Sequence, residues 1–371
     1  MRKRVSVVAI AALALPLAAC STAPDEGVLG SAGCPADIRI QTDDLPNADW
    51  GFLYSLLDPA SASIRPGAQS VTGLLLVDGE PSGVKLTILS GDPGDGVSAA
   101  VALHDDESIL LGAVDTDAAV LQAEQYPTIG LFAPTAKDPR MVYWAPAKHP
   151  GVRSIEQLGA IRDREGVPVP ITLRPNDPFG TYMLGSGRLP EGQVQDGAPS
   201  PEAFLESEGL PHAGDLLVDP VHLRRAEKPR EFALQSIDDA GYPRDTLLAA
   251  RPQAVVRYAD CFRVLIPVLQ QAIVDYVGSP TETNAFLVKV AGRFGHPELD
   301  AEVIVAAYDL LVKQRMISNG FDSAIGDVDF GRVRELISDM RGAWANLERR
   351  LPPVEAEDIV SNEFVDRSIG L

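Results

Sequence analysis

The chain has 371 residues, 45% of them hydrophobic, and carries 52 acidic side chains against 32 lysines and arginines, a formal net charge of −20. This length is enough for about two domains, and this share of hydrophobic residues supports a sizeable core. The negative charge argues against binding nucleic acid or anionic lipid through bulk electrostatics, so we expect no nucleic-acid partner.

The first 20 residues carry the features of an export signal. A basic start at residues 2–4 precedes an apolar run over 5–17, which is too short to span the ~30 Å hydrocarbon core of a bilayer. The next four-residue motif, Leu17-Ala18-Ala19-Cys20, resembles a bacterial lipobox. That resemblance implies removal of residues 1–19 and a lipid on Cys20. The alternative is a plain secretory signal followed by a chance cysteine.

Residues 20–36 are rich in glycine, serine and proline and predict a flexible tether. We therefore expect the mature protein on the extracytoplasmic side of the cell membrane, anchored through Cys20. The two other cysteines, Cys34 and Cys261, would then meet an oxidising compartment, which predicts a disulfide between them. Such a bond would place the start of the folded body beside its late third.

Three strand–loop–helix units follow the tether. The strands are predicted over 37–41, 84–89 and 108–114, with helices over 50–57 and 97–103 and a third ending at residue 123. Near-continuously apolar strands that alternate with helices indicate a parallel sheet covered on both faces. A further strand is predicted over 127–134, and residues 135–139 break the pattern.

A second α/β block follows, and the chain then turns helical. The strands of this block are predicted over 141–144, 169–173, 216–218, 231–235 and 246–250. An apolar stripe with helical spacing begins near residue 259 and contains Pro267, which should kink the helix or mark its start. Amphipathic helices are expected over 303–312 and 330–347, with their apolar faces in the core.

The order of these elements predicts a two-lobed body with two crossings between the lobes. The predicted parts are a lipoprotein signal (1–19), the tether (20–36), the first part of lobe I (37–138), lobe II (139–250), and a return to lobe I with C-terminal helices and a tail (251–371).

Sequence motifs for catalysis or metal binding are weak. His212 and His222 lie near Asp215 and Asp219, but no closely spaced ligand pair is present, so we expect no metal site. The glycine-rich segment 91–96 lacks the lysine of a nucleotide-binding loop. We expect no cofactor and no enzymatic activity.

Several segments, taken in order, carry a family resemblance. They are Asp49–Tyr54, Leu89–Gly94, Leu110–Asp117, Phe132–Pro139, Ser154–Gly159 and Asp219–Pro220. In this order they resemble the type II periplasmic solute-binding proteins, and most closely the nitrate/sulfonate/taurine group and the thiamine-pyrimidine (Thi5-like, or NMT1-like) domains. The resemblance implies an α/β fold of two lobes with a ligand cleft between them and a helical C-terminal extension. Relatives often have glutamate in place of Asp219, and Trp50 replaces a histidine of the pyrimidine binders, so the ligand stays open.

The resemblance implies a monomeric, lipid-anchored solute-binding component of an ABC importer. It would capture a small nitrogen- or sulfur-containing organic solute by cleft closure and deliver it to a membrane permease and its ATPase. One alternative is a Thi5-like pyrimidine-related enzyme, whose histidine, cysteine cluster and cofactor lysine are not recognisable here. Another is a lipoprotein that senses or scaffolds without transport.

Ligands of open α/β sheets bind at the carboxyl ends of the strands, so we expect the ligand-binding residues in the loops that follow the strands. The candidate ligand-binding residues are Asp43, Trp50, Gly51, Ser90, Gly91, Asp92, Thr116, Asp117, Asp177, Thr181 and Asp219. Trp50 offers a stacking face, while Asp117 and Asp219 can accept hydrogen bonds from an amine or a ring nitrogen. An aspartate after a strand is also a common helix cap, which is the alternative for each one. Because these loops hold carboxylates and no arginine cluster, we expect a heteroaromatic or amine-bearing solute rather than a sulfonate.

Overall fold

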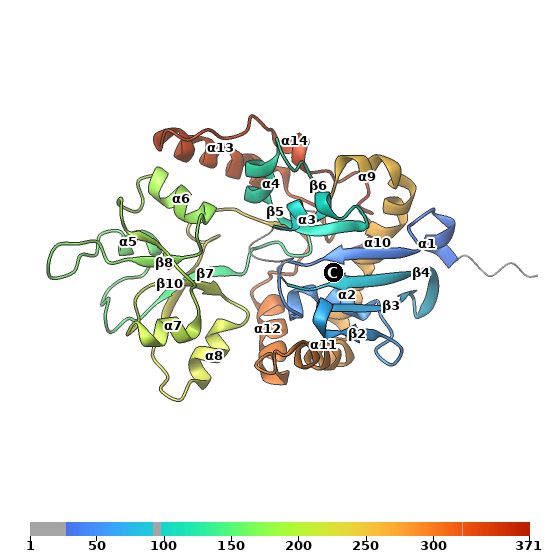
Figure 1. The fold of residues 1–371 in the computed structure, drawn as a ribbon, viewed down its shortest axis with the longest axis horizontal. Helices are drawn as coiled ribbons and strands as arrows, with labels where there is room; N and C mark the ends of the chain where they lie inside the picture. The colour runs from blue at the N-terminus through green and yellow to red at the C-terminus, as the bar shows by residue number, and fades with distance from the viewer. Residues whose placement is uncertain (1–26, 92–97, 321) are drawn as a thin grey trace, which may run out of the picture.

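The computed structural model describes residues 27–91, 98–320 and 322–371. The predicted signal sequence, Cys20 and the predicted ligand residue Asp92 lie outside the described residues. The described residues form two lobes, each built around its own β-sheet and covered by helices (Figure 1).

The sheet of lobe I has the order β2-β3-β4-β1-β5-β12-β6. Its strands are β1 (Asp37–Gln41), β2 (Ser63–Arg65), β3 (Ser70–Val77), β4 (Glu80–Leu89), β5 (Ile109–Asp115), β6 (Ile129–Phe132) and β12 (Thr246–Ala250). The central strand β1 pairs in parallel with β4 and β5, as the apolar strands predict. Strand β12 inserts between β5 and β6, antiparallel to both. The strand predicted over 246–250 therefore belongs to the sheet of lobe I, and its placement in the second block, lobe II, is wrong.

The sheet of lobe II has the order β11-β7-β10-β8-β9. Its strands are β7 (Arg140–Trp144), β8 (Ile171–Leu173), β9 (Val194–Asp196), β10 (His212–Asp215) and β11 (Ala233–Ser236). The chain enters this sheet after β6 and leaves it after β11, which gives two crossings between the lobes. The strand predicted over 216–218 is wrong, because β10 ends at Asp215 and residues 216–218 lead into helix α8.

Fourteen α-helices lie in the described residues. They are α1 (Gly27–Ser31), α2 (Gly51–Ser55), α3 (Ala99–Asp105), α4 (Thr116–Gln122), α5 (Ile155–Leu158), α6 (Pro178–Gly185), α7 (Pro201–Glu206), α8 (Asp219–Arg225), α9 (Pro252–Arg257), α10 (Ala259–Gly278), α11 (Thr281–Phe294), α12 (Ala301–Lys313), α13 (Phe330–Asn346) and α14 (Ala356–Ile359). Short 3₁₀ helices cover Ala48–Trp50 and Pro66–Ala68. Helix α10 begins well before Pro267, so this proline lies inside the helix and does not mark its start.

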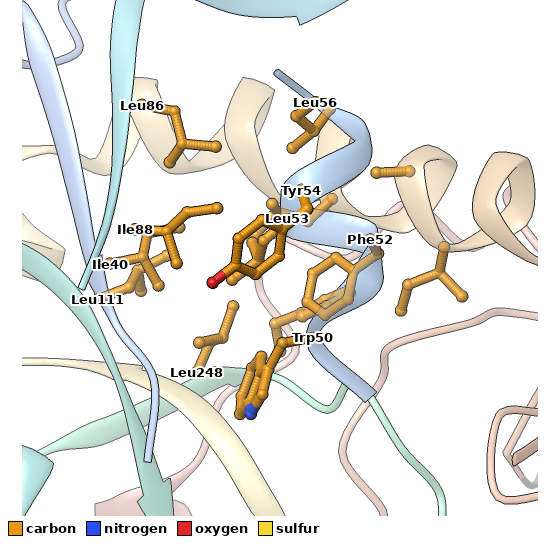
Figure 2. Packing of buried hydrophobic residues seen from close by; sticks show 14 of the residues in the cluster. Ile40, Trp50, Phe52, Leu53, Tyr54, Leu56, Leu86, Ile88, Leu111 and Leu248 are labelled. Carbon is orange, nitrogen blue, oxygen red and sulfur yellow. The ribbon is translucent and has the colours of Figure 1, made fainter. Parts of the chain in front are cut away.

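The core of lobe I is packed between α2 and the sheet. Figure 2 shows Trp50, Phe52 and Tyr54 on this short segment facing strand residues that include Ile40 and Leu248. A Cβ at Gly51 would lie 2.3 Å from the Tyr276 ring, so only glycine lets α10 approach α2 this closely. The burial of these aromatic side chains fixes the segment that follows the first strand.

The N-terminal part of the described chain is held in lobe I. Helix α1 lies inside the predicted tether, and its Leu29 is fully buried. A disulfide joins Cys34 to Cys261 of α10, as predicted. The flexible tether is therefore wrong for residues 27–36, because burial and the disulfide fasten them to the core.

One helix in the described part of the chain, α10, is long and apolar enough to cross a membrane. Its apolar face is buried in the lobe I core, with Phe262, Leu265 and Ile273 fully covered. We therefore interpret α10 as a core helix.

Helix α13 connects the two lobes on one side of the molecule, between α6 and α14 (Figure 1). A Cβ at Gly185 would lie 2.2 Å from the carbonyl oxygen of Ala343, so α6 and α13 pack at backbone contact. Asn346 Nδ2 donates to the Gly185 carbonyl oxygen at 3.0 Å, and Arg332 bonds Asp238 and Asp245 at 2.7 and 3.1 Å. The C-terminal region thus packs on lobe II as well as on lobe I.

Candidate functional site

A cavity of about 270 Å³ lies between the lobes. Lobe I contributes the segment after β1, lobe II contributes the ends of β8 and β10, and both crossings add side chains. This is the position where open α/β sheets bind ligands, beside the carboxyl ends of their strands.

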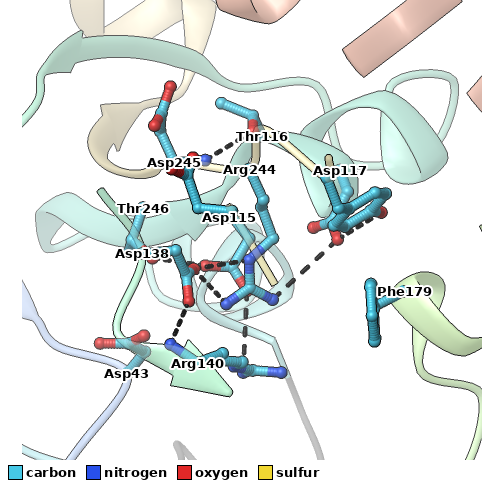
Figure 3. A network of polar contacts seen from close by, with 12 residues as sticks. Asp43, Asp115, Thr116, Asp117, Asp138, Arg140, Phe179, Arg244, Asp245 and Thr246 are labelled. Carbon is cyan, nitrogen blue, oxygen red and sulfur yellow. Dashed lines mark hydrogen bonds and ion pairs between the residues drawn. The ribbon is translucent and has the colours of Figure 1, made fainter. Parts of the chain in front are cut away.

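A buried ion network lies on the hinge side of the cavity. The Arg244 side chain is only 4% exposed, and its Nε donates to Asp138 Oδ2 at 2.7 Å. A second nitrogen lies 3.0 Å from Asp115 Oδ2 and 4.0 Å from Asp117 Oδ2 (Figure 3). Burial alone would raise the pKa of Asp115, but the charges of Arg244 and Arg140 outweigh it and hold that pKa below its usual value. This network ties the end of β5 to both crossings.

Two more arginines line the cavity. Arg140, on β7, lies 3.9 Å from Asp115 and 3.8 Å from Asp177, so its ion pairs are loose. Arg174 directly follows β8, and its side chain makes no hydrogen bond or ion pair with any residue that the structure describes. The candidate loops themselves contribute Arg174 and no arginine cluster, but the cavity lining as a whole contains three arginines. The arginines come from lobe II and the second crossing rather than from the lobe I loops.

Five aspartates line the cavity without a basic side chain within 4.0 Å among the described residues. They are Asp43, Asp44 and Asp49 of lobe I and Asp215 and Asp219 of lobe II. Asp43 Oδ1 accepts a hydrogen bond from Trp50 Nε1 at 3.1 Å, and Asp219 Oδ2 accepts one from the Asp215 amide at 3.0 Å.

The pKa values of all five carboxyl groups are raised. Enclosure by the two lobes and the nearby carboxylates of Asp115 and Asp44 raise the pKa of Asp43 to about 7, although its side chain faces the open cavity. Burial, followed by the charges of Glu202 and Asp44, raises the pKa of Asp219 to about 7. Burial and neighbouring carboxylates likewise raise the pKa values of Asp49 and Asp215 well above their usual range. Burial also raises the pKa of Asp44.

Four predicted ligand residues line this cavity: Asp43, Trp50, Asp177 and Asp219. Asp177 also caps α6, where its Oδ1 accepts a hydrogen bond from the Phe179 amide at 2.9 Å. Their contact with a ligand stays a prediction.

The other described candidates lie outside the cavity lining, and each has a structural partner. Ser90 bonds the Tyr54 hydroxyl, the Gly91 carbonyl accepts from Gln41, Thr116 accepts from the Asp245 amide, Asp117 accepts from the Tyr242 hydroxyl, Thr181 donates to the Asp177 carbonyl, and Gly51 faces Tyr276. Three lining aspartates were not predicted: Asp44 and Asp215, which lie near strand ends, and Asp49, which lies in the short 3₁₀ helix before α2. The three lining arginines were not predicted either.

His212 and His222, which were considered as metal ligands from the sequence, lie outside the cavity lining. His212 Nε2 is 3.1 Å from Ser207 Oγ. Among the described residues, no three histidine, cysteine or acidic side chains are placed to hold a metal ion.

A second contact between the lobes lies at α8 and α12. Arg225 of α8 pairs with Asp300, which caps α12, through two hydrogen bonds of 2.6 and 3.1 Å. Val221 packs in the same cluster as Leu299 and Val303. The two lobes thus contact each other at α8 with α12, and α13 contacts α6 of lobe II.

No family model and no curated protein matches this sequence. Solved structures do. The ligand-binding component of an ABC-type import system from Staphylococcus aureus, solved with zinc bound, has a TM-score of 0.56 at 10% identity and covers 89% of this chain and 99% of its own. The periplasmic nitrate-binding protein NrtA from Synechocystis PCC 6803 has a TM-score of 0.55 at 10% identity, covering 89% and 87%. The CA3427 gene product of Candida albicans, described as having the generic periplasmic binding protein fold, has a TM-score of 0.50 at 11% identity, covering 89% and 97%.

The chain has the periplasmic-binding-protein fold. This confirms the predicted two-lobed α/β architecture of type II. In periplasmic binding proteins the lobes close around a ligand by hinge and shear motions, so the cavity between the two sheets is where this fold would take one.

Proposed function

We propose that this protein is the solute-binding component of an ABC importer. It captures a small nitrogen- or sulfur-containing organic solute in the cavity between its lobes and delivers it to a membrane permease and its ATPase. The observation that carries the proposal is the cavity itself, which both lobes and both crossings line with charged side chains. The fold supports it, because solved structures of the same fold include binding components of import systems.

The protein acts as a monomer on the extracytoplasmic side, anchored by the lipid on Cys20. The disulfide between Cys34 and Cys261 supports an oxidising compartment. Replacing Cys20 by alanine should move the protein from the membrane fraction to the soluble fraction. A wild-type protein that is already soluble would favour a plain secretory signal.

A thermal-shift screen of the mature chain tests solute binding. The panel spans amines, pyrimidines, amino acids, taurine, alkyl sulfonates and nitrate. A ligand at a hundred times its dissociation constant adds about 2.7 kcal/mol to the free energy of unfolding, which raises the melting temperature measurably. A panel with no stabilising member contradicts the proposal.

A cavity variant shows whether such binding occurs between the lobes. Ala213 of β10 lines the cavity, so Ala213→Leu narrows it and should abolish the thermal shift. The matched control is Ala60→Leu, because Ala60 is exposed in the turn between α2 and β2. An unchanged shift in Ala213→Leu would place binding elsewhere.

Transport and sensing make different predictions for the cell. Deleting the gene should abolish uptake of the solute that stabilises the protein. Unchanged uptake would favour a lipoprotein that senses or scaffolds, and turnover of the solute by the pure protein would favour an enzyme.

A further inference from the structure

The cavity between the lobes has more carboxyl groups than its own arginines pair with. Arg244 is paired with Asp138 and Asp115, and Arg140 lies between Asp115 and Asp177. Each of these two arginines therefore already has aspartate partners within the protein. Their positive charges are already engaged before any ligand enters.

The carboxyl groups that remain outnumber the arginines that remain. Five aspartates of the lining have no ion pair, and Arg174 is the one lining arginine without an ion pair among the described residues. An anionic ligand would have to lie among these carboxylates, where like charges repel at short range. A cationic group would lower the raised pKa values of these carboxyl groups, so that they ionise as it binds and attract it.

The five aspartates belong to both lobes. Asp43, Asp44 and Asp49 lie in the segment between β1 and α2 of lobe I. In lobe II, Asp215 is the last residue of β10 and Asp219 is the first residue of α8. Carboxylates of one lobe also raise the pKa values of those on the other, since Asp44 acts on Asp215. Closing the empty cleft therefore opposes ionisation of carboxyl groups on both lobes, while a cation between the lobes favours their charged form and is attracted to both sides.

We propose, resting on the solute-binding function above, that the ligand is a small organic cation whose ammonium or amidinium group lies between the lobe I aspartates and Asp215 and Asp219. The fold and the cavity indicate where the ligand binds, and the unpaired carboxyl groups indicate that its charge is positive. The buried indole of Trp50 borders the same cavity and donates its N–H to Asp43, which orients that carboxyl group.

Size and geometry favour an organic cation over a metal ion. A volume of about 270 Å³ corresponds to about nine water molecules at ~30 Å³ each, which suits a solute of several heavy atoms. No group of three potential metal ligands is assembled within the described ranges.

The test is calorimetric titration of the mature chain at pH 7.5 with probes that differ in charge. The cations are 1,4-diaminobutane, butylamine and butylguanidine; the anions are butanesulfonate and nitrate; the metal ions are Ca²⁺ and Mg²⁺. We expect at least one organic cation to bind at one site per chain and the anions to give no heat of binding. Binding of an anion, or of a metal ion alone, overturns the proposal while leaving solute binding intact. A chain that binds none of them and also fails the wider solute screen contradicts the proposed function itself.

Charge-removing variants locate the cation. Asp219→Asn and Asp43→Asn keep an oxygen acceptor for the Asp215 amide and for the Trp50 N–H, so both should fold. Each should weaken cation binding about tenfold or more, because a hydrogen bond to a charged group is lost. The control is Asp105→Asn, which removes a carboxylate from an exposed residue at the end of α3, outside the cavity lining. The affinity of this variant for the cation should stay within about twofold of the wild-type affinity. Equal affinities in wild type, Asp219→Asn and Asp43→Asn would overturn the proposal.

Discussion

Replacing Asp219 by asparagine is expected to stabilise the ligand-free protein at neutral pH. Burial raises the pKa of this carboxyl group from 3.8 to about 7, and the charges of Glu202 and Asp44 add to the effect. One pKa unit corresponds to 1.36 kcal/mol, so the whole shift corresponds to about 4 kcal/mol. Asp219 is partly exposed to water in the cleft, which screens its charge, so we expect a gain of about 2 kcal/mol.

The stability difference between wild type and Asp219→Asn should depend on pH. The folded protein keeps the proton of Asp219 up to about pH 7, whereas the unfolded chain loses it near pH 4. Between these values the folded state binds more protons, so wild-type stability falls as the pH rises, and the loss is complete above about pH 7. Asparagine does not titrate, so the variant should equal wild type near pH 4 and exceed it above pH 7.

Urea unfolding at pH 4.5, 6, 7.5 and 8.5 measures the difference. For a chain of this size, a gain of about 2 kcal/mol corresponds to a rise of about 3 °C in melting temperature. The Asp105→Asn control should change stability by less than about 0.5 kcal/mol at every pH, because Asp105 is exposed. An Asp219→Asn variant that is less stable than wild type at pH 8.5, or equally stable at every pH, refutes the reasoning.

Three further perturbations test the fold around the cavity. Arg225→Gln removes the ion pair between α8 and α12 and should enlarge the radius of gyration of the ligand-free protein in X-ray scattering. Arg263→Gln, which removes an exposed ion pair within α10, should leave that radius unchanged. Arg244→Ala leaves Asp138 and Asp115 buried without their cation and should cost about 3–5 kcal/mol in urea unfolding, whereas a cost below 1 kcal/mol would contradict the ion network. Reducing the disulfide should lower the unfolding free energy by about 5 kcal/mol, because the bond closes a very long loop, and an unchanged urea midpoint with reductant would contradict this.

Local sequence patterns predicted most of the sheet of lobe I. The apolar segments at β1, β4 and β5 alternate with helices, which predicted their parallel pairing. The disulfide between Cys34 and Cys261 was also predicted correctly. The hairpin of β3 and β4 was missed, although Asp78-Gly79 between two apolar runs is a strong turn signal, and both residues have positive φ. Residues 27–31 were missed because their glycines and serine resemble a linker, while burial of Leu29 fixes them as a helix.

The site was predicted where it depends on strand ends and missed where it depends on how the lobes face each other. Asp43 and Asp219 follow strands of the two sheets and reach the cavity as expected. Asp117 follows β5 in the same way, but Tyr242 and Arg244 cover it, and only the tertiary structure shows this. Arg174 carries the same signal as Asp43, since it directly follows a strand, and could have been found.

A calorimetric titration of wild type and of Ala213→Leu, with a solute that stabilises the protein, shows whether that solute binds between the lobes. We expect one binding site per wild-type chain and no binding by Ala213→Leu, because leucine narrows the cavity. The Ala60→Leu control should bind the solute as wild type does. Equal binding by wild type and by a folded Ala213→Leu variant would contradict a ligand site between the lobes.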